Sequence, residues 1–217
     1  LSGRSKEWRE DMRKKVCVVC LLGAILMGCA SVELEERSFP LMAAVGFEDK
    51  KVSYVLGFAR LEAADGQATI SNEISVKPTK ERTFLESKQA YESHLNKITD
   101  YNHLKVLVLE EDLLEEPKVY NEMVESLAKE EAFPRNTYVC VVDDIEDLME
   151  IEKVLPQDLG TYLEEYLVHS KPKDERIPTL GDLIDERENK ELVLYLPYLE
   201  TEETYVVGEG FYPVGLK

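Results

Sequence analysis

Basic residues are scarce in this 217-residue chain relative to acidic ones. It has 26 Lys and Arg against 44 Asp and Glu, a formal net charge of −18 at pH 7. A protein this acidic repels phosphate backbones, so we expect no nucleic-acid partner. The sequence also has no Gly-x-Gly-x-x-Gly, no Gly-Lys-Ser/Thr phosphate loop and no Gly-x-Ser-x-Gly. The usual signatures of dinucleotide binding, nucleotide hydrolysis and serine hydrolysis are therefore missing.

Long apolar segments are also scarce, because the longest one covers only residues 16–27. A transmembrane helix needs about 18 or more apolar residues, so this run is too short for a confident membrane span. It has the length of the apolar part of an export signal, and Arg13, Lys14 and Lys15 precede it as a basic part. The run ends in Leu26-Met27-Gly28-Cys29, which resembles the cleavage box of a bacterial lipoprotein signal.

We therefore predict a signal peptide over residues 1–28, cleaved after Gly28, with Cys29 carrying diacylglycerol on its thiol. An ordinary secretory signal and a buried core helix are the alternatives. Residues 1–11 are unusual before such a signal, so Met12 is a candidate for the true start. Basic residues stand only on the amino side of the apolar run, so the bulk of the protein should lie outside the cytoplasm.

Cysteine is rare and poorly placed for disulfides. Cys17 and Cys20 have the Cys-x-x-Cys spacing of redox and metal motifs, but both lie in the segment that we expect to be removed. If Cys29 carries lipid, Cys140 is the one free thiol of residues 29–217. It lies in an apolar run, so we predict a small core residue. No disulfide, metal or cofactor is expected.

The mature chain of 189 residues is long enough for one domain with a sizeable core. Residues 29–38 form a short charged tether, and residues 39–217 form the single predicted domain. The first 28 residues hold six basic and three acidic residues, which leaves residues 29–217 with a net charge of −21.

The first half of the domain predicts a hairpin and a helix. Residues 39–48 and 52–61 are apolar runs across a short polar turn, the pattern of a β-hairpin. Residues 73–76 are a candidate short strand, and residues 83–99 have helical periodicity. The apolar face of that helix consists of Phe84, Tyr91, Leu95 and Ile98.

The middle of the chain predicts a β-α-β unit. Residues 104–109 and 137–142 are continuous apolar runs rich in branched residues, which favours strands buried on both faces. A helix over residues 118–131 separates them. We therefore expect a parallel pair with a right-handed crossover, in a mixed α/β domain.

The last third alternates caps, helices and strands. Asp143 and Asp144 can cap a helix that runs to about residue 154. Pro197 should end the strand before it or place that strand at an edge. The other predicted elements are a helix over residues 158–169, a capping box at residues 179–182, and strands over residues 192–196 and 205–207.

No catalytic or metal constellation stands out. The three histidines lack ligand spacing, and we expect surface or satisfied core residues at His94, His103 and His169. The acidic runs at residues 110–112 and 143–144 have ligand types that suit a divalent cation. Charge at helix amino termini and a solvated face are the favoured explanation of these runs.

Several segments, in order along the chain, resemble the Ger(x)C spore germination lipoproteins, the C subunits of nutrient germinant receptors. The best match is residues 100–109, which look like the family's Tyr-x-His-Leu-Lys strand, followed by residues 111–114. Ala30 stands where the family often has Trp. Family members continue into further domains, and we expect those later domains to be absent here. The other matching segments are Cys29 with residues 33–40 and 44–48, residues 134–138 with Arg-Asn-Thr, residues 159–163 and 179–183, and residues 196–199 and 207–210.

The resemblance implies a protein that is not an enzyme. It implies a lipoprotein held by its lipid on the outer face of the bacterial cell membrane, here the spore inner membrane. Its implied partners are the integral membrane A and B subunits that act with it in nutrient-triggered germination.

Two other classes remain as alternatives. A solute-binding lipoprotein would typically have two α/β lobes and a longer chain, and its ligand would raise the melting temperature. An envelope lipoprotein hydrolase would need a nucleophile–base pair or a metal set, and the sequence shows no recognisable signature of either.

Overall fold

The computed structural model describes residues 36–59, 78–95, 97–130, 132–171, 176–189 and 192–215. Residues 37–217 form one compact unit. Gly28, Cys29 and the strand expected over residues 73–76 lie outside the described residues.

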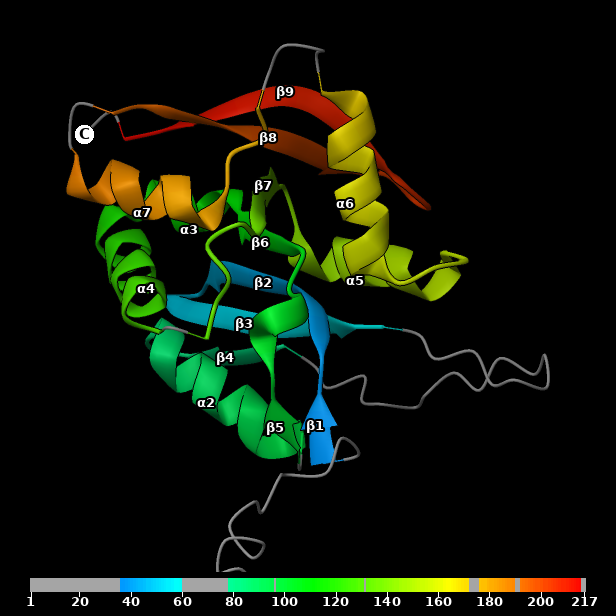
Figure 1. Cartoon of the computed structure of the whole chain (residues 1–217), viewed down its shortest axis with the longest axis horizontal. Coiled ribbons are helices and arrows are strands. Elements are labelled where there is room, and N and C mark those ends of the chain that lie inside the picture. Colours follow the sequence, from blue (N-terminus) through cyan, green and yellow to red (C-terminus); the bar gives the residue numbers. More distant parts are fainter. Residues whose placement is uncertain are drawn as a thin grey trace, which may run out of the picture. The chain divides into compact units, whose positions relative to one another are not determined.

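A seven-stranded mixed sheet forms the centre of the unit, in the order β4–β3–β2–β6–β7–β8–β9 (Figure 1). β2, β6, β7 and β8 run parallel, and the pairs β2–β3, β3–β4 and β8–β9 are antiparallel. This arrangement confirms the predicted mixed α/β class and the parallel β-α-β pair. The strands are β2 (Pro40–Glu48), β3 (Lys51–Phe58), β4 (Thr79–Glu81), β6 (Val106–Glu110), β7 (Tyr138–Val142), β8 (Leu194–Thr201) and β9 (Val206–Val214).

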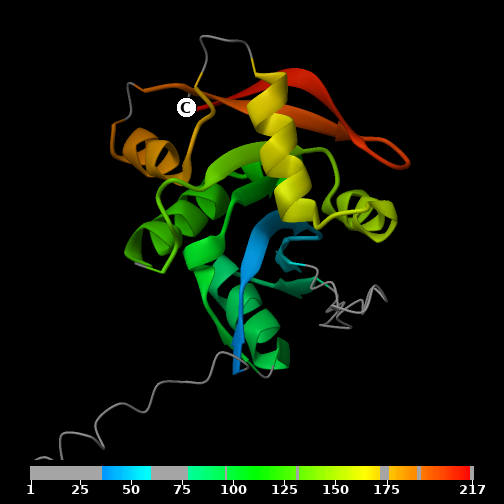
Figure 2. The ribbon, with the colours of Figure 1, turned by 45° about the vertical axis from the view of Figure 1, so that its right-hand side comes forward.

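Helices cover both faces of the sheet. Figures 1 and 2 show α2, α4 and α7 along one face and α5 and α6 along the other. A second, two-stranded parallel sheet pairs β1 (Arg37–Ser38) with β5 (Ile98–Thr99). The helices are α2 (Phe84–Leu95), α3 (Glu111–Glu115), α4 (Pro117–Lys129), α5 (Ile145–Val154), α6 (Leu159–Ser170), α7 (Leu180–Glu188) and the 3₁₀ helix η2 (Tyr101–His103).

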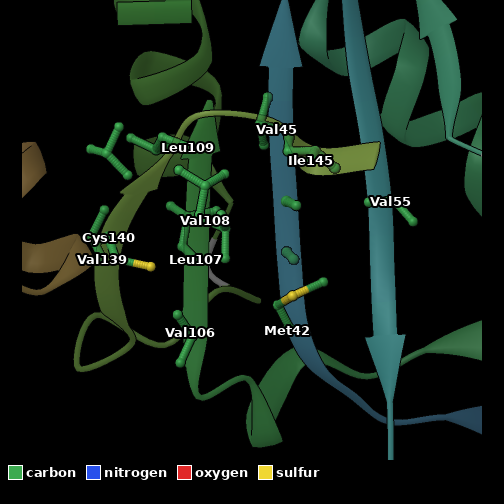
Figure 3. Close-up of a cluster of buried hydrophobic side chains, with 14 of the residues drawn as sticks. Met42, Val45, Val55, Val106, Leu107, Val108, Leu109, Val139, Cys140 and Ile145 are labelled. Carbon is green, nitrogen blue, oxygen red and sulfur yellow. The ribbon is translucent and has the colours of Figure 1, made fainter. Parts of the chain in front are cut away.

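β6 and β7 lie in the middle of the sheet and are buried on both faces, as predicted. The first four side chains of β6 and the last four of β7 are fully buried. Figure 3 shows side chains of these two strands beside Met42 and Val45 of β2. An unbroken apolar run suits this position, because helices on either side leave no face of these strands to water.

The predicted hairpin is present as β2 and β3, which pair from Pro40↔Phe58 to Glu48↔Lys51. Asp49 and Lys50 connect them with φ angles of 51° and 61°. Positive φ at both central residues is typical of the tight hairpin turn whose twist matches that of the strands. Asp tolerates this conformation better than Lys does, because its short side chain bonds locally.

The predicted helix caps are confirmed at atomic detail. Asp144 accepts from the backbone N–H groups of Glu146 and Asp147 at the start of α5. Asp158, which the sequence analysis did not identify as a cap, accepts from Thr161 N at the start of α6. Thr179 and Asp182 form a reciprocal capping box at the start of α7. Each side chain satisfies a donor that the first turn of a helix leaves unpaired.

Three sequence predictions were wrong in their bounds. The helix expected over residues 83–99 ends at Leu95, and Ile98 is 55% exposed in β5 instead of packing on the helix face. The pairing of β5 with β1 extends the chain there, and helical periodicity contains no information about that partner. β8 continues through Pro197 to Thr201, and β9 is longer than the predicted residues 205–207. Pro197 is tolerated because β8 pairs with β7 only at Tyr198 and Leu199.

Candidate functional site

We call the side of the sheet where the parallel strands begin the amino edge, and the side where they end the carboxyl edge. At the amino edge, two segments that are far apart in the sequence form one polar pocket of about 240 Å³. Residues 102–105 supply one wall, and residues 134–138 supply the other. The first wall belongs to the segment with the best family resemblance in the sequence, and the second to another of the matching segments. Glu164 of α6 completes the lining, and nothing in the sequence pattern singled it out.

Backbone hydrogen bonds fix the two walls to each other. Tyr138 N donates to Lys105 O at 2.9 Å, the first rung between β6 and β7. The buried Thr137 hydroxyl donates to Leu104 O at 3.2 Å. The Arg-Asn-Thr segment therefore has a structural role, because its threonine satisfies a carbonyl that β7 does not reach.

The 3₁₀ helix η2 presents Asn102 and His103 to the pocket. Asp100 caps it by accepting from Asn102 N at 3.1 Å, and Arg37 donates to the same carboxylate at 2.9 Å. The Asn102 backbone N–H, followed by the Arg37 guanidinium, lowers the pKa of the Asp100 carboxyl. The His103 ring lies edge-on to the Phe39 ring, with 5.5 Å between ring centres. Arg37 and Phe39 are thus fastened beside the pocket.

The pocket has a charge pair and uncharged polar groups. Lys105 Nζ donates to Thr161 Oγ1 at 3.0 Å and lies 2.8 Å from Glu164 Oε2. No hydroxyl or thiol nucleophile is paired with His103 in the contacts of the described residues. The same residues contain no group of three His, Cys, Asp or Glu that could hold a metal ion. The charge pair and the uncharged polar groups of this pocket can make polar contacts with a partner.

The carboxyl edge holds the acidic runs and a second pocket of about 140 Å³. Glu110 is a structural clamp there, because it accepts from Phe47 N at 2.9 Å and from Ile145 N at 3.2 Å. Burial raises the pKa of this carboxyl, and the two N–H groups oppose the shift. Gly46 leaves room for it, since a Cβ at that position would lie 2.3 Å from Glu110 Oε2. Asp143 likewise accepts from the N–H and hydroxyl of Thr201, so both acids tie strands together.

A third pocket of about 250 Å³ is an apolar groove between α6 and the β8–β9 hairpin. Tyr166 OH accepts from Gly208 N at 2.6 Å, and Tyr162 OH accepts from Val206 N at 3.3 Å. These bonds attach the edge strand β9 to α6. Phe211, which is 50% exposed, lines the groove.

The remaining candidate residues have ordinary surroundings. His94 and His169 are exposed, and in each a ring nitrogen lies 2.6–2.7 Å from the carbonyl of the residue four positions earlier. Cys140 is fully buried, which confirms the predicted core position, and burial raises its pKa to about 12. Within the described ranges, no helix is both long and apolar enough to cross a membrane.

Comparison with known proteins gives one match. The model of the family described as "Spore germination protein N-terminal domain" matches residues 30–201. The match begins directly after Cys29 and ends at the last residue of β8. It includes both walls of the polar pocket. No curated protein and no solved structure matches the chain.

Proposed function

Because this chain belongs to the spore germination protein N-terminal domain family, we propose that it is a membrane-anchored, non-catalytic lipoprotein subunit of a nutrient germinant receptor. Membership gives the protein a germination-related role. The observation that carries the proposal is the family match, which extends over residues 30–201. The order of the Ger(x)C-like segments in the sequence supports the receptor-subunit assignment.

The proposed anchor is a lipid on Cys29. Support comes from the basic residues, the short apolar run and the terminal Gly28-Cys29 pair in the sequence. Two or more acyl chains hold a protein firmly at a bilayer, at roughly 0.8 kcal/mol per buried methylene. In this proposal residues 1–28 are removed, residues 29–38 are the tether and residues 39–217 are the domain. The domain then lies on the outer face of the spore inner membrane.

The proposed partners are the integral membrane A and B subunits of the receptor. A non-catalytic role is supported by the family, which is not a known enzyme family. It is also supported by the pocket at the amino edge, where Lys105 is engaged with Glu164 and His103 with Phe39. Co-purification of the A and B subunits with the lipidated chain from spore membranes would test the assignment.

The decisive experiment is nutrient germination of spores that lack the gene, followed by release of dipicolinic acid. We expect loss of response to one class of nutrient, restored by the wild-type gene and not by Cys29→Ala. Cys140→Ala is the matched control, since it also removes one thiol but leaves the predicted anchor intact. Full restoration by Cys29→Ala would refute the anchor, and normal germination without the gene on every nutrient would count against the receptor role.

A further inference from the structure

Charge is unevenly divided between the two edges of the sheet. At the carboxyl edge, residues 48–51, 110–115 and 143–147 hold ten acidic and two basic residues. Lys80 of β4 adds a third cation and is bonded to Glu48 and Glu146. This edge therefore keeps a large excess of negative charge.

The amino edge is close to electrical balance. We call its exposed part the base, which consists of Ile98, Asn102, His103, Arg135 and Asn136. Ile98 is 55% exposed, and Asn102 and Asn136 carry no charge. Three ion pairs of the described residues lie at this edge: Arg37 with Asp100 at 2.9 Å, Lys105 with Glu164 at 2.8 Å, and Arg135 with Asp185 at 3.8 Å.

The chain joins the domain at this same edge. β1 is held by its pairing with β5, and Asp100 N donates to Ser38 O at 2.9 Å. Seven residues lie between Cys29 and Arg37, so the eight residue-to-residue steps of a fully extended tether reach about 29 Å. The nine residues of β2 then lead to the carboxyl edge, about 27 Å farther along the strand.

We propose that the base faces an anionic lipid surface and that the carboxyl edge points away from it. The proposal rests on the lipid anchor at Cys29. Turning the carboxyl edge toward the bilayer would bring its excess of acids within the Debye length of about 8 Å from anionic head groups, which is unfavourable. The base has no such excess, and Ile98 adds an apolar contact. Glu36, next to Arg37, comes nearer the lipid in the proposed orientation, but it is a single charge against the ten acidic and three basic residues of the carboxyl edge.

The orientation is tested with a fluorophore on a single introduced thiol, at the base in Ile98→Cys or at the carboxyl edge in Lys51→Cys. Cys140 is fully buried and does not compete for the label. The lipidated protein is placed on phosphatidylglycerol–phosphatidylcholine vesicles that carry a nitroxide on a head group. We expect quenching at position 98 to exceed that at position 51 by about twofold or more, and the difference to shrink at high salt. Equal quenching, or stronger quenching at position 51, would overturn the proposal.

Charge-reversal variants test whether electrostatic repulsion from the lipid is the cause of the orientation. The double variant Asp112→Lys, Glu115→Lys should narrow the difference in quenching between positions 98 and 51, because it reduces the negative charge of the carboxyl edge. Glu122→Lys with Glu165→Lys makes the same change in net charge on two helices and should leave the difference in place. An unchanged difference in the first variant would overturn the electrostatic explanation.

The anchor and the orientation are tested separately. Mass spectrometry of the amino-terminal peptide reports acylation of Cys29, and its absence would refute the proposed anchor. The orientation is then measured with ten histidines in place of Cys29 on vesicles that contain a nickel-chelating lipid. If the protein is bound but quenching at position 98 does not exceed that at position 51, the proposed orientation is refuted and the proposed anchor is not.

Discussion

Lys88 of α2 is a buried cation, and replacing it with Met should destabilise the domain. Its side chain is 7% exposed, and Nζ lies 2.9 Å from Glu130 Oε1 and 3.1 Å from Glu92 Oε1. The same ammonium group lies 5.3 Å from the centre of the Tyr101 ring. Met preserves the apolar stem of the side chain but leaves both carboxylates without their cation.

The size of the loss in folding stability depends on the exposed fraction of each Glu side chain. Removing one partner of a fully buried ion pair costs about 3–5 kcal/mol. The side chains of Glu92 and Glu130 are 27% and 33% exposed, so water compensates part of the loss. We therefore expect Lys88→Met to lower the free energy of unfolding by about 2 kcal/mol. For a domain of this size, that corresponds to a fall in Tm of roughly 4–8 °C.

The measurement is urea unfolding followed by circular dichroism, with Lys129→Met as the matched control. Lys129 makes a comparable pair with Glu125 at 2.7 Å, but its side chain is 73% exposed. Its replacement should cost less than about 0.5 kcal/mol, because water screens surface pairs. Equal unfolding midpoints for the two variants would refute the reasoning, since burial would then make no difference.

Three further perturbations have outcomes fixed by the structure. Gly46→Ala should cost about 2 kcal/mol in urea unfolding, because its Cβ would displace the Glu110 carboxylate from its two N–H donors. Lys50→Gly should raise the free energy of unfolding by about 0.5–1 kcal/mol, since glycine adopts its φ of 61° without strain. Asp100→Asn should be less stable than wild type at neutral pH. The pKa of Asp100 is lowered chiefly by Asn102 N–H, so the difference should vanish as pH falls through that lowered value.

Each of these predictions has an outcome that contradicts it. A Gly46→Ala protein as stable as wild type would mean that Glu110 does not need its present position. A loss of stability in Lys50→Gly would mean that the Lys50 side chain stabilises the domain by more than its positive-φ backbone conformation destabilises it. A constant difference between Asp100→Asn and wild type from neutral pH to about pH 2 would exclude the carboxylate charge as the cause.

Local chemistry made much of the fold predictable. The runs at β6 and β7 could be assigned because strands covered on both faces tolerate only apolar side chains. The caps at Asp144 and Thr179 could be assigned because short oxygen-bearing side chains satisfy the first N–H groups of a helix. For the caps, the partner of each group lies within a few residues along the chain.

Structural features that depend on residues far apart in the sequence could not be predicted. The true end of α2 depends on β1, which draws Ile98 into a strand. The length of β8 depends on its pairing with β9, which offsets the cost of Pro197. The polar pocket needs the register of β6 against β7 and the approach of Glu164 from α6. Nothing in the sequence around Glu164 distinguishes it from other helix-surface acids.

The two ends of the seven-stranded sheet are poor templates for another strand. At one end, β4 has only three residues, one of which is Lys80. At the other, the hydroxyls of Tyr162 and Tyr166 occupy N–H groups of β9, and Pro213 has no N–H to offer. Proteins anchored in one membrane plane meet edge to edge at high local concentration, where open strand edges promote aggregation. If the protein is anchored as proposed, the short edge at β4 and the capped edge at β9 would let neighbouring copies stay separate on the membrane.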